Sequence, residues 1–136
     1  MAQAKERETL PCPAQLVWRT VTGEDQLSWR TGLKALEQEA EGIWLETGTD
    51  GSRYRLEQVV WEPERRVVLR VTGRNTYGKR ELLLEESSGG TTVTIYSETM
   101  GESVFADLME GAYLRRSQRA YLRDLRRRLC PPKEEE

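Results

Sequence analysis

Arginine, tyrosine and glutamine side chains are the groups in this sequence best suited to hold or activate a small molecule. Alternation and helical spacing place Arg80, Arg115 and Tyr54 on inward faces of predicted elements. A guanidinium group binds a carboxylate or an enolate through two parallel hydrogen bonds. A tyrosine hydroxyl donates to a carbonyl oxygen and can transfer a proton to it. These residues predict a site that orients the polar end of a ligand or stabilises an enolate.

The sequence contains no histidine, and this excludes several kinds of site. Ser-His-Asp and Cys-His nucleophile systems and histidine-ligated zinc are ruled out. Cys12 and Cys130 form no metal-binding pattern, and we expect two free thiols. Carboxylates such as Glu46 would act as general bases only if buried, and paired surface charges are the default. We therefore predict no catalytic set, no metal and no cofactor, and we favour a non-enzymatic role.

The elements that must position these residues follow from hydrophobic periodicity. A first strand at 6–11 precedes two short helices, one from Pro13 to Gly23 and one at 25–29. Period-two patterns between turn residues then predict six strands, at 33–40, 43–48, 52–61, 65–73, 79–86 and 91–100. Residues 102–129 return to helical spacing. We expect an α+β helix-grip fold, in which a curved antiparallel sheet of about seven strands wraps around one long C-terminal helix.

Polar residues interrupt the apolar stripe of the long helix. Steps of four and three residues from Gly111 place Arg115 and Gln118 on the side that faces the sheet. A buried polar group without a partner costs roughly 1–3 kcal/mol, so this part of the helix should face a ligand, water or a counter-charge. In the alternative, a helix rotation of about 40° carries Arg115 into solvent on its long apolar stem.

The predicted cavity lies between the inner sheet face and this helix. Its apolar residues would bury the body of a ligand, and its polar residues would orient one end. The predicted ligand-binding residues are Tyr54, Leu56, Gln58, Leu69, Arg80, Leu82, Ile95, Ser97, Leu108, Met109, Ala112 and Arg115. Trp61 falls on the charged face of its strand, where it would be exposed or would form a homodimer contact.

Length and charge limit the partners. The 136 residues fit one domain, 1–136, with a flexible tail at 131–136. With 21 basic and 23 acidic residues the net charge is −2, so we expect no nucleic-acid partner. The sequence has neither an apolar stretch of the roughly 18 residues that a membrane span requires nor a signal-peptide core. We expect a cytoplasmic protein without integral membrane insertion.

Several short motifs resemble the SRPBCC superfamily, the START-related polyketide cyclase/dehydrase and lipid-transport proteins. Pro13–Trp18 resembles its opening P-x-x-x-V-W helix, and Gly89–Thr94 is similar to its G-G-T-x-V-T hairpin. Tyr121–Leu125 is similar to the Y-L-x-x-L end of its last helix. The resemblance covers about residues 8–129 and implies a helix-grip fold with a cavity. It implies no catalytic set, because members share a container rather than one chemistry.

Three functions follow as hypotheses. The favoured one is binding or carrying a hydrophobic or amphipathic small molecule, such as a lipid, a polyketide-like compound or an isoprenoid. The alternative is a cyclase or dehydratase in which Arg115 or Arg80 stabilises an enolate and Tyr54 moves a proton. A third hypothesis, which rests on the resemblance, is a protein-interaction module of co-chaperone type.

Overall fold

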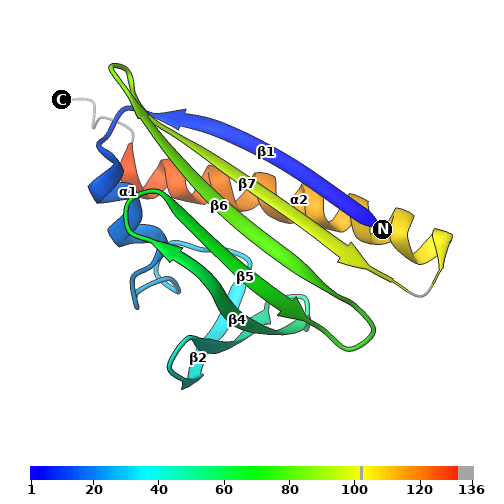
Figure 1. The fold of residues 1–136 in the computed structure, drawn as a ribbon. Coiled ribbons are helices and arrows are strands. Elements are labelled where there is room, and N and C mark those ends of the chain that lie inside the picture. Colours follow the sequence, from blue (N-terminus) through cyan, green and yellow to red (C-terminus); the bar gives the residue numbers. More distant parts are fainter. Residues whose placement is uncertain (102, 132–136) are drawn as a thin grey trace.

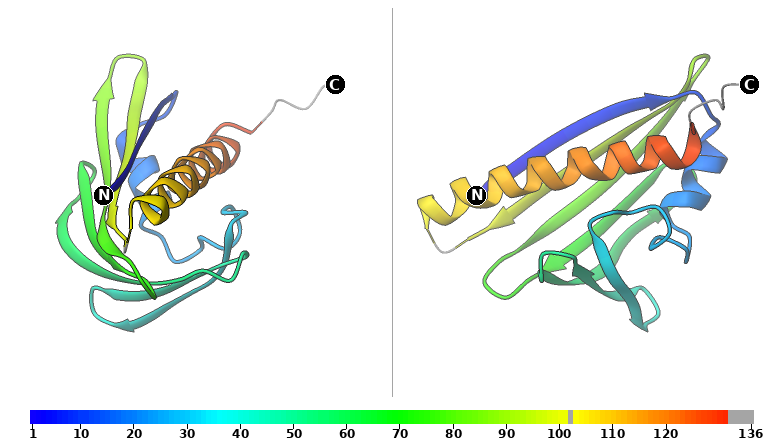
Figure 2. Two further views of the ribbon diagram at one scale, coloured as in Figure 1. Left: turned by 90° about the vertical axis from the view of Figure 1, so that its right-hand side faces the viewer. Right: turned by 180° about the vertical axis from the view of Figure 1, so that it is seen from behind.

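A computed structural model describes residues 1–101 and 103–131 of the chain. They form a seven-stranded antiparallel sheet that curves around a long C-terminal helix (Figure 1, Figure 2). The elements, in chain order, are β1 (Ala2–Leu10), α1 (Ala14–Val21), β2 (Leu33–Ala40), β3 (Ile43–Gly48), β4 (Arg53–Glu62), β5 (Arg66–Thr72), β6 (Tyr77–Ser87), β7 (Gly90–Met100) and α2 (Val104–Leu129). The predicted helix-grip α+β fold is confirmed.

The sheet is a meander closed by the first strand. Strands β2 to β7 pair consecutively, and β1 pairs antiparallel with β7, which gives the order β1-β7-β6-β5-β4-β3-β2. Tight turns make this possible. Gly42, for example, joins β2 to β3 with a φ of 73°, a left-handed conformation that favours glycine. At the far end of the meander, β2 and β3 curve round towards α2 (Figure 2).

The apolar core packs where α1 and the C-terminal half of α2 meet the sheet. Its buried residues come from α1, from the sheet and from the C-terminal half of α2, and include Leu10, Val17, Val93, Leu122 and Leu125. These side chains fill the region next to α1. Val67, Leu82 and Ile95 of the same cluster also line the space between the sheet and the middle of α2.

The predicted second short helix is wrong. Residues 27–29 form a turn, in which the backbone amides of Trp29 and Arg30 donate to the carbonyl of Gln26 at 3.3 and 3.0 Å. The Gln26 side chain donates instead to the carbonyls of Val21 and Gly23, so it caps the end of α1. One turn without further hydrogen bonds does not propagate as a helix, because nucleation is costly.

The other element boundaries differ from the predictions by a few residues. Strand β1 begins at Ala2, four residues before the predicted start at residue 6. Helix α2 begins after Ser103, whose hydroxyl accepts from the amide of Ala106 at 3.0 Å, an N-cap. Most of the predicted flexible tail, residues 132–136, lies outside the described residues. In the described part of the chain, no helix has the length and apolar character needed to cross a bilayer.

Candidate functional site

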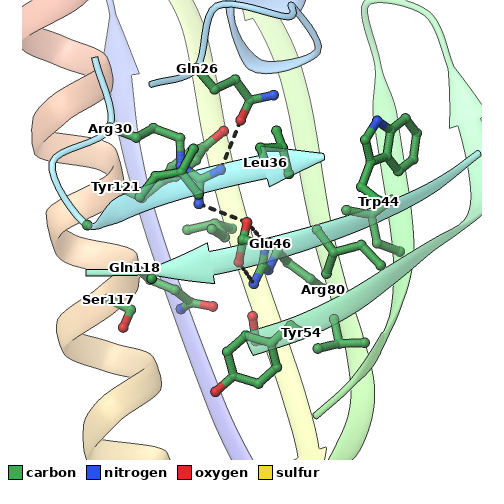
Figure 3. Close-up of a pocket in the computed structure, with 18 of the residues that line it drawn as sticks. Gln26, Arg30, Leu36, Trp44, Glu46, Tyr54, Arg80, Ser117, Gln118 and Tyr121 are labelled. Atoms are coloured by element: carbon green, nitrogen blue, oxygen red, sulfur yellow. Dashed lines mark hydrogen bonds and ion pairs between the residues drawn. The ribbon is translucent and has the colours of Figure 1, made fainter. Parts of the chain in front are cut away.

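A cavity of about 750 Å³ lies between the inner face of the sheet and α2. Its walls are formed by strands β2 to β7, by the loop between α1 and β2, and by one side of α2 (Figure 3). Small-molecule sites have volumes of roughly 300–1,000 Å³. The cavity is therefore large enough for a ligand of drug or lipid size.

Apolar side chains of the sheet line most of this cavity. They alternate along neighbouring strands and include Leu36, Trp44, Leu56, Trp61, Val67, Leu69, Val71, Leu82 and Ile95. Trp44 and Trp61 stack with ring centroids 6.1 Å apart and an interplanar angle of 18°. These aromatic faces and aliphatic side chains provide a surface on which the apolar body of a ligand can be buried.

A β-bulge brings Trp61 into the cavity wall. The pairing of β4 with β5 shifts between Gln58 and Val60, so the strict alternation along β4 is broken there. Trp61 then pairs with Val67 and lies on the same side as Leu56. The prediction of an exposed Trp61 is wrong, and the reason for a homodimer contact at this residue is lost.

A buried group of three charged side chains lies at the polar part of the cavity. Glu46, on β3, is only 7% exposed. Arg80 of β6 donates to both of its carboxylate oxygens, from Nη1 to Oε2 at 3.1 Å and from Nη2 to Oε1 at 3.0 Å. Arg30 donates from Nη2 to Oε2 at 3.0 Å and from Nη1 to Gln26 Oε1 at 2.9 Å (Figure 3). Each guanidinium thus commits two of its four terminal N–H donors to protein partners.

These contacts determine the protonation state of Glu46. Burial by itself would raise the pKa of this carboxyl, but the charges and hydrogen bonds of Arg80 and Arg30 outweigh it and lower the pKa to about 2. Glu46 is therefore ionised at neutral pH and is a weak base. It serves as a structural counter-charge and is unsuited to general-base catalysis.

Tyr54 lies on β4, near the polar part of the cavity (Figure 3). Burial is the main cause that raises the pKa of its hydroxyl, and the neighbouring Glu110 and Tyr113 add to it. The pKa of Glu110 is itself raised, by burial and by Asp107. Tyr54 therefore stays protonated at neutral pH and can donate a hydrogen bond to a ligand.

Several buried polar atoms on the cavity lining have no hydrogen-bond partner. In residues 1–101 and 103–131 such side-chain atoms are Thr99 Oγ1, Glu110 Oε1, both amide atoms of Gln118, and Asp124 Oδ1. Thr99, Glu110 and Gln118 all line the cavity. Unpartnered buried polar atoms are uncommon in folded proteins and call for an explanation. Here they are concentrated where a ligand would supply the missing partners.

Seven of the predicted ligand-binding residues line this cavity. They come from β4 to β7 and are Tyr54, Leu56, Leu69, Arg80, Leu82, Ile95 and Ser97. Whether they contact a ligand stays a prediction. Their shared position follows from correct strand alternation in these four strands.

Five predicted residues lie elsewhere. Gln58 is exposed beside Gly42, at the bulge that ends the alternation of β4. On α2, Leu108 and Met109 are 67% and 58% exposed, and Ala112 and Arg115 are exposed on a shallow outer surface. Gln118 faces the cavity as predicted, but its neighbours on that side of α2 are Glu110, Leu114 and Tyr121 and not Arg115. The alternative prediction, in which the side chain of Arg115 lies in solvent, is therefore the correct one.

The sequence alone does not identify Arg30 as a residue of the site, and it predicts by default a paired surface charge at Glu46. Arg30 lies in the loop one residue after the helix predicted at 25–29, and no periodic pattern marks a loop residue. Glu46 is paired across the ladder with Tyr54, and Trp44 with Leu56, so each pair shares a face. The register of β3 against β4 would therefore have placed Glu46 and Trp44 inward. In the described residues, no group of three or more acidic, cysteine or histidine side chains could hold a metal ion.

Comparisons with known proteins agree with this architecture. The sequence profile of the family described as polyketide cyclase/dehydrase and lipid transport matches residues 1–129. A search of curated proteins finds no match for this chain.

Solved structures share the fold at low sequence identity. The protein XoxI from Bacillus cereus has a TM-score of 0.77 and 12% identity over 99% of this chain and 100% of its own. MLL2253 from Mesorhizobium loti has a TM-score of 0.77 and 11% identity over 97% and 99%. DynU16, a protein in the dynemicin biosynthetic locus, has a TM-score of 0.75 and 21% identity over 95% of this chain, which spans 47% of DynU16. Structural similarity at such low sequence identity shows a shared fold and nothing further.

Proposed function

Because this chain belongs to the polyketide cyclase/dehydrase and lipid-transport family, we propose that it binds one amphipathic small molecule between the sheet and α2. The observation that carries the proposal is the cavity of about 750 Å³, with its apolar walls and its unpartnered buried polar atoms. An apolar pocket with a few converging polar groups is the usual form of a small-molecule site.

The distribution of side chains supports one orientation of the ligand. Leu36 and Trp44 lie to one side of the cavity, while Tyr54 and Gln118 lie on the other side of Glu46 and Arg80 (Figure 3). The apolar body would contact the indole rings and the leucines, where burial contributes about 25 cal/mol per Å². The polar end would lie near Tyr54 and Gln118, which can hydrogen-bond to it.

Binding can be measured with the fluorescent apolar probe N-phenyl-1-naphthylamine. We expect saturable binding of one probe per chain, with increased probe fluorescence. Ser97 is 4% exposed and lines the cavity, so the bulky side chain of Ser97→Trp should weaken probe binding at least about tenfold. Glu98 follows it on β7 and does not line the cavity, so Glu98→Trp is the matched control and should bind as the wild type does.

Two results would contradict the proposal. The first is a folded wild-type protein that shows no saturable binding of the probe. The second is equal loss of affinity in both tryptophan variants, which would place the probe outside the cavity. Circular dichroism of each variant establishes that it is folded.

A cyclase-type reaction is a second candidate, and one observation favours it. Tyr54 and Glu110 both line the cavity, and the pKa of each is raised, chiefly by burial. A protonated tyrosine beside a carboxyl group of raised pKa could move a proton at a ligand carbonyl. Arg115 points outward and so cannot stabilise an enolate in the cavity, contrary to the sequence prediction. Arg80, the other arginine predicted for this role, is bound to Glu46. Binding without turnover therefore remains the first proposal.

Proton exchange separates the two candidates. An enzyme of this type should accelerate exchange of the α-protons of methyl 3-oxodecanoate in D₂O, as measured by proton NMR. Tyr54→Phe and Glu110→Gln should both abolish the acceleration while the naphthylamine probe still binds. A wild-type rate equal to that of buffer removes the enzymatic candidate.

The remaining predictions on location and partners accompany this proposal. Cys12 and Cys130 are free thiols, which suits a reducing compartment such as the cytoplasm. Four statements stay predictions: that the ligand is a lipid, a polyketide-like compound or an isoprenoid, that the protein forms a homodimer, that the chain is a single domain, and that it acts as a co-chaperone-type interaction module.

A further inference from the structure

We infer that Gln118 selects an uncharged ligand, whose polar end both donates and accepts hydrogen bonds, over a carboxylate. Ligands of this chemical class carry a primary amide or a hydroxyl group at the end of an apolar body. The inference deepens the proposed binding function and rests on it.

Gln118 is the central observation. It comes from the middle of α2, is 3% exposed and lines the cavity. Its side chain extends from the helix towards the strands that carry Glu46, Arg80 and Tyr54 (Figure 3). Neither Nε2 nor Oε1 has a hydrogen-bond partner. One amide thus presents an unused donor and an unused acceptor side by side.

Packing alone does not account for a glutamine at this position. An unpartnered buried amide is costly, and an apolar side chain of the same shape would be neutral or stabilising. Leu114 and Tyr121, one turn away on either side, contribute apolar surface to the same cavity. A ligand that pairs with the Gln118 amide would offset the cost on binding.

The charges around the cavity give a carboxylate no net attraction. Four basic and four acidic side chains line it, namely Arg30, Lys79, Arg80 and Arg116 against Glu24, Glu46, Asp50 and Glu110. Their formal charges cancel. The two most buried guanidinium groups, Arg30 and Arg80, already bind Glu46. A ligand carboxylate that binds either of these two arginines would have to displace Glu46 or lie close to it, and like charges at short range repel.

A second unpartnered atom favours the same class of ligand. Thr99 is 3% exposed, lines the cavity from β7, and its hydroxyl has no partner. A hydroxyl both donates and accepts, as the Gln118 amide does. An uncharged group with both functions can satisfy either residue, whereas a carboxylate only accepts.

The experiment uses a pair of ligands of nearly the same shape, decanamide and decanoate at neutral pH. Displacement of N-phenyl-1-naphthylamine gives the Kd of each. We expect wild-type protein to bind decanamide at least about tenfold more tightly than decanoate. Gln118→Met keeps the length of the side chain and removes the amide. It should weaken the affinity for decanamide about tenfold, which corresponds to the loss of roughly one hydrogen bond. The affinities for decanoate and for the probe should change by less than about twofold.

Gln58→Met is the matched control, because Gln58 is exposed and does not line the cavity. It should leave every affinity unchanged. Gln118→Met should also unfold at an equal or higher temperature than the wild type, since it removes an unpartnered amide. If Gln118→Met fails to fold, Gln118→Leu takes its place.

The outcomes separate this inference from the proposed function. A wild-type protein that does not bind the probe overturns both. A protein that binds the probe but prefers decanoate overturns the inference alone. The same holds if the preference for decanamide is as large in Gln118→Met as in the wild type, because bulk desolvation of the anion would then explain it.

Discussion

Glu46 is the residue on which the polar part of the cavity depends. Its carboxylate accepts three hydrogen bonds from two arginines that come from different parts of the chain. A buried ion pair contributes little net stability compared with apolar residues, but removal of one partner leaves an uncompensated charge. Glu46 therefore holds Arg30 and Arg80 in place.

Removal of this charge should be costly. We expect Glu46→Gln to lower the free energy of unfolding by about 3 kcal/mol, because Arg80 and Arg30 lose their counter-charge. Glu57→Gln is the control, since Glu57 pairs with the half-exposed or more exposed Arg55 and Arg70. It should cost less than about 1 kcal/mol in the same urea titration. Equal losses in the two variants would contradict the assigned role of Glu46.

The depressed pKa of Glu46 also predicts a dependence on pH. Its folded pKa of about 2 lies below its ordinary value of 4.5, so the unfolded chain takes up the proton first as the pH falls. The stabilisation is complete above pH 4.5 and is lost between about 4.5 and 2. The difference in stability between wild type and Glu46→Gln should therefore shrink from pH 6 to about pH 3. A constant difference across this range would show that the pKa of Glu46 is not lowered in the folded protein.

The loop between α1 and β2 is an element without regular structure that nevertheless forms part of the cavity wall. It is attached to α2 through Asp124, which is 3% exposed. Asp124 Oδ2 accepts from the backbone amide and the hydroxyl of Thr31, both at 2.8 Å. Gln26 and Arg30, on the same loop, thereby reach the cavity.

Loss of this attachment should loosen the loop. We expect Asp124→Ala to lower the free energy of unfolding by about 2–3 kcal/mol, because two hydrogen bonds to a buried carboxylate are lost. Thr31→Val removes only the hydroxyl and should cost roughly half as much. Hydrogen exchange should become faster at the amides of residues 29–33 in Asp124→Ala. Unchanged exchange there would mean that other contacts hold the loop.

Elements differ in how well the sequence predicts them, for physical reasons. In β5 and β7 the residues that point inward recur at every second position, and Leu69, Ile95 and Ser97 were correctly placed on the cavity side. Gln58 pairs with the cavity-lining Leu69 but is exposed beside Gly42, and alternation along one strand does not show how far a side chain lies from the cavity. Arg115 was misplaced because an apolar stripe fixes the rotation of a helix only within tens of degrees. Its polar neighbour Gln118 was correctly placed towards the sheet.

At the scale of the whole molecule, three of the seven arginines of α2 pair with acids from other parts of the chain. Arg119 pairs with Glu6 at 3.5 Å, and Arg126 pairs with Glu8, both of them across to β1. Arg128 pairs with Asp25 of the loop at 3.5 Å. Such pairing reduces the positive potential that a row of arginines would otherwise produce.

Nucleic acid should therefore not bind this surface. We expect no change in the fluorescence anisotropy of a labelled 20-base-pair DNA duplex with protein at micromolar concentration in about 50 mM salt. Glu6→Lys with Glu8→Lys should create weak, salt-sensitive binding, because it removes the balance on β1. Salt-dependent binding by the wild type would contradict the prediction.

The stacked indoles of Trp44 and Trp61 give the protein an optical property of its own. Their ring planes are nearly parallel and their centroids are 6.1 Å apart, with Trp18 edge-on to Trp61 at 5.4 Å. Indoles at this separation couple their excited states, and we expect a paired positive and negative band in far-ultraviolet circular dichroism to the extent that their transition moments are not parallel. Because both rings line the cavity, a molecule that settles against them alters the couplet. Occupancy can thus be followed without a dye or a label, in whatever state the protein is isolated.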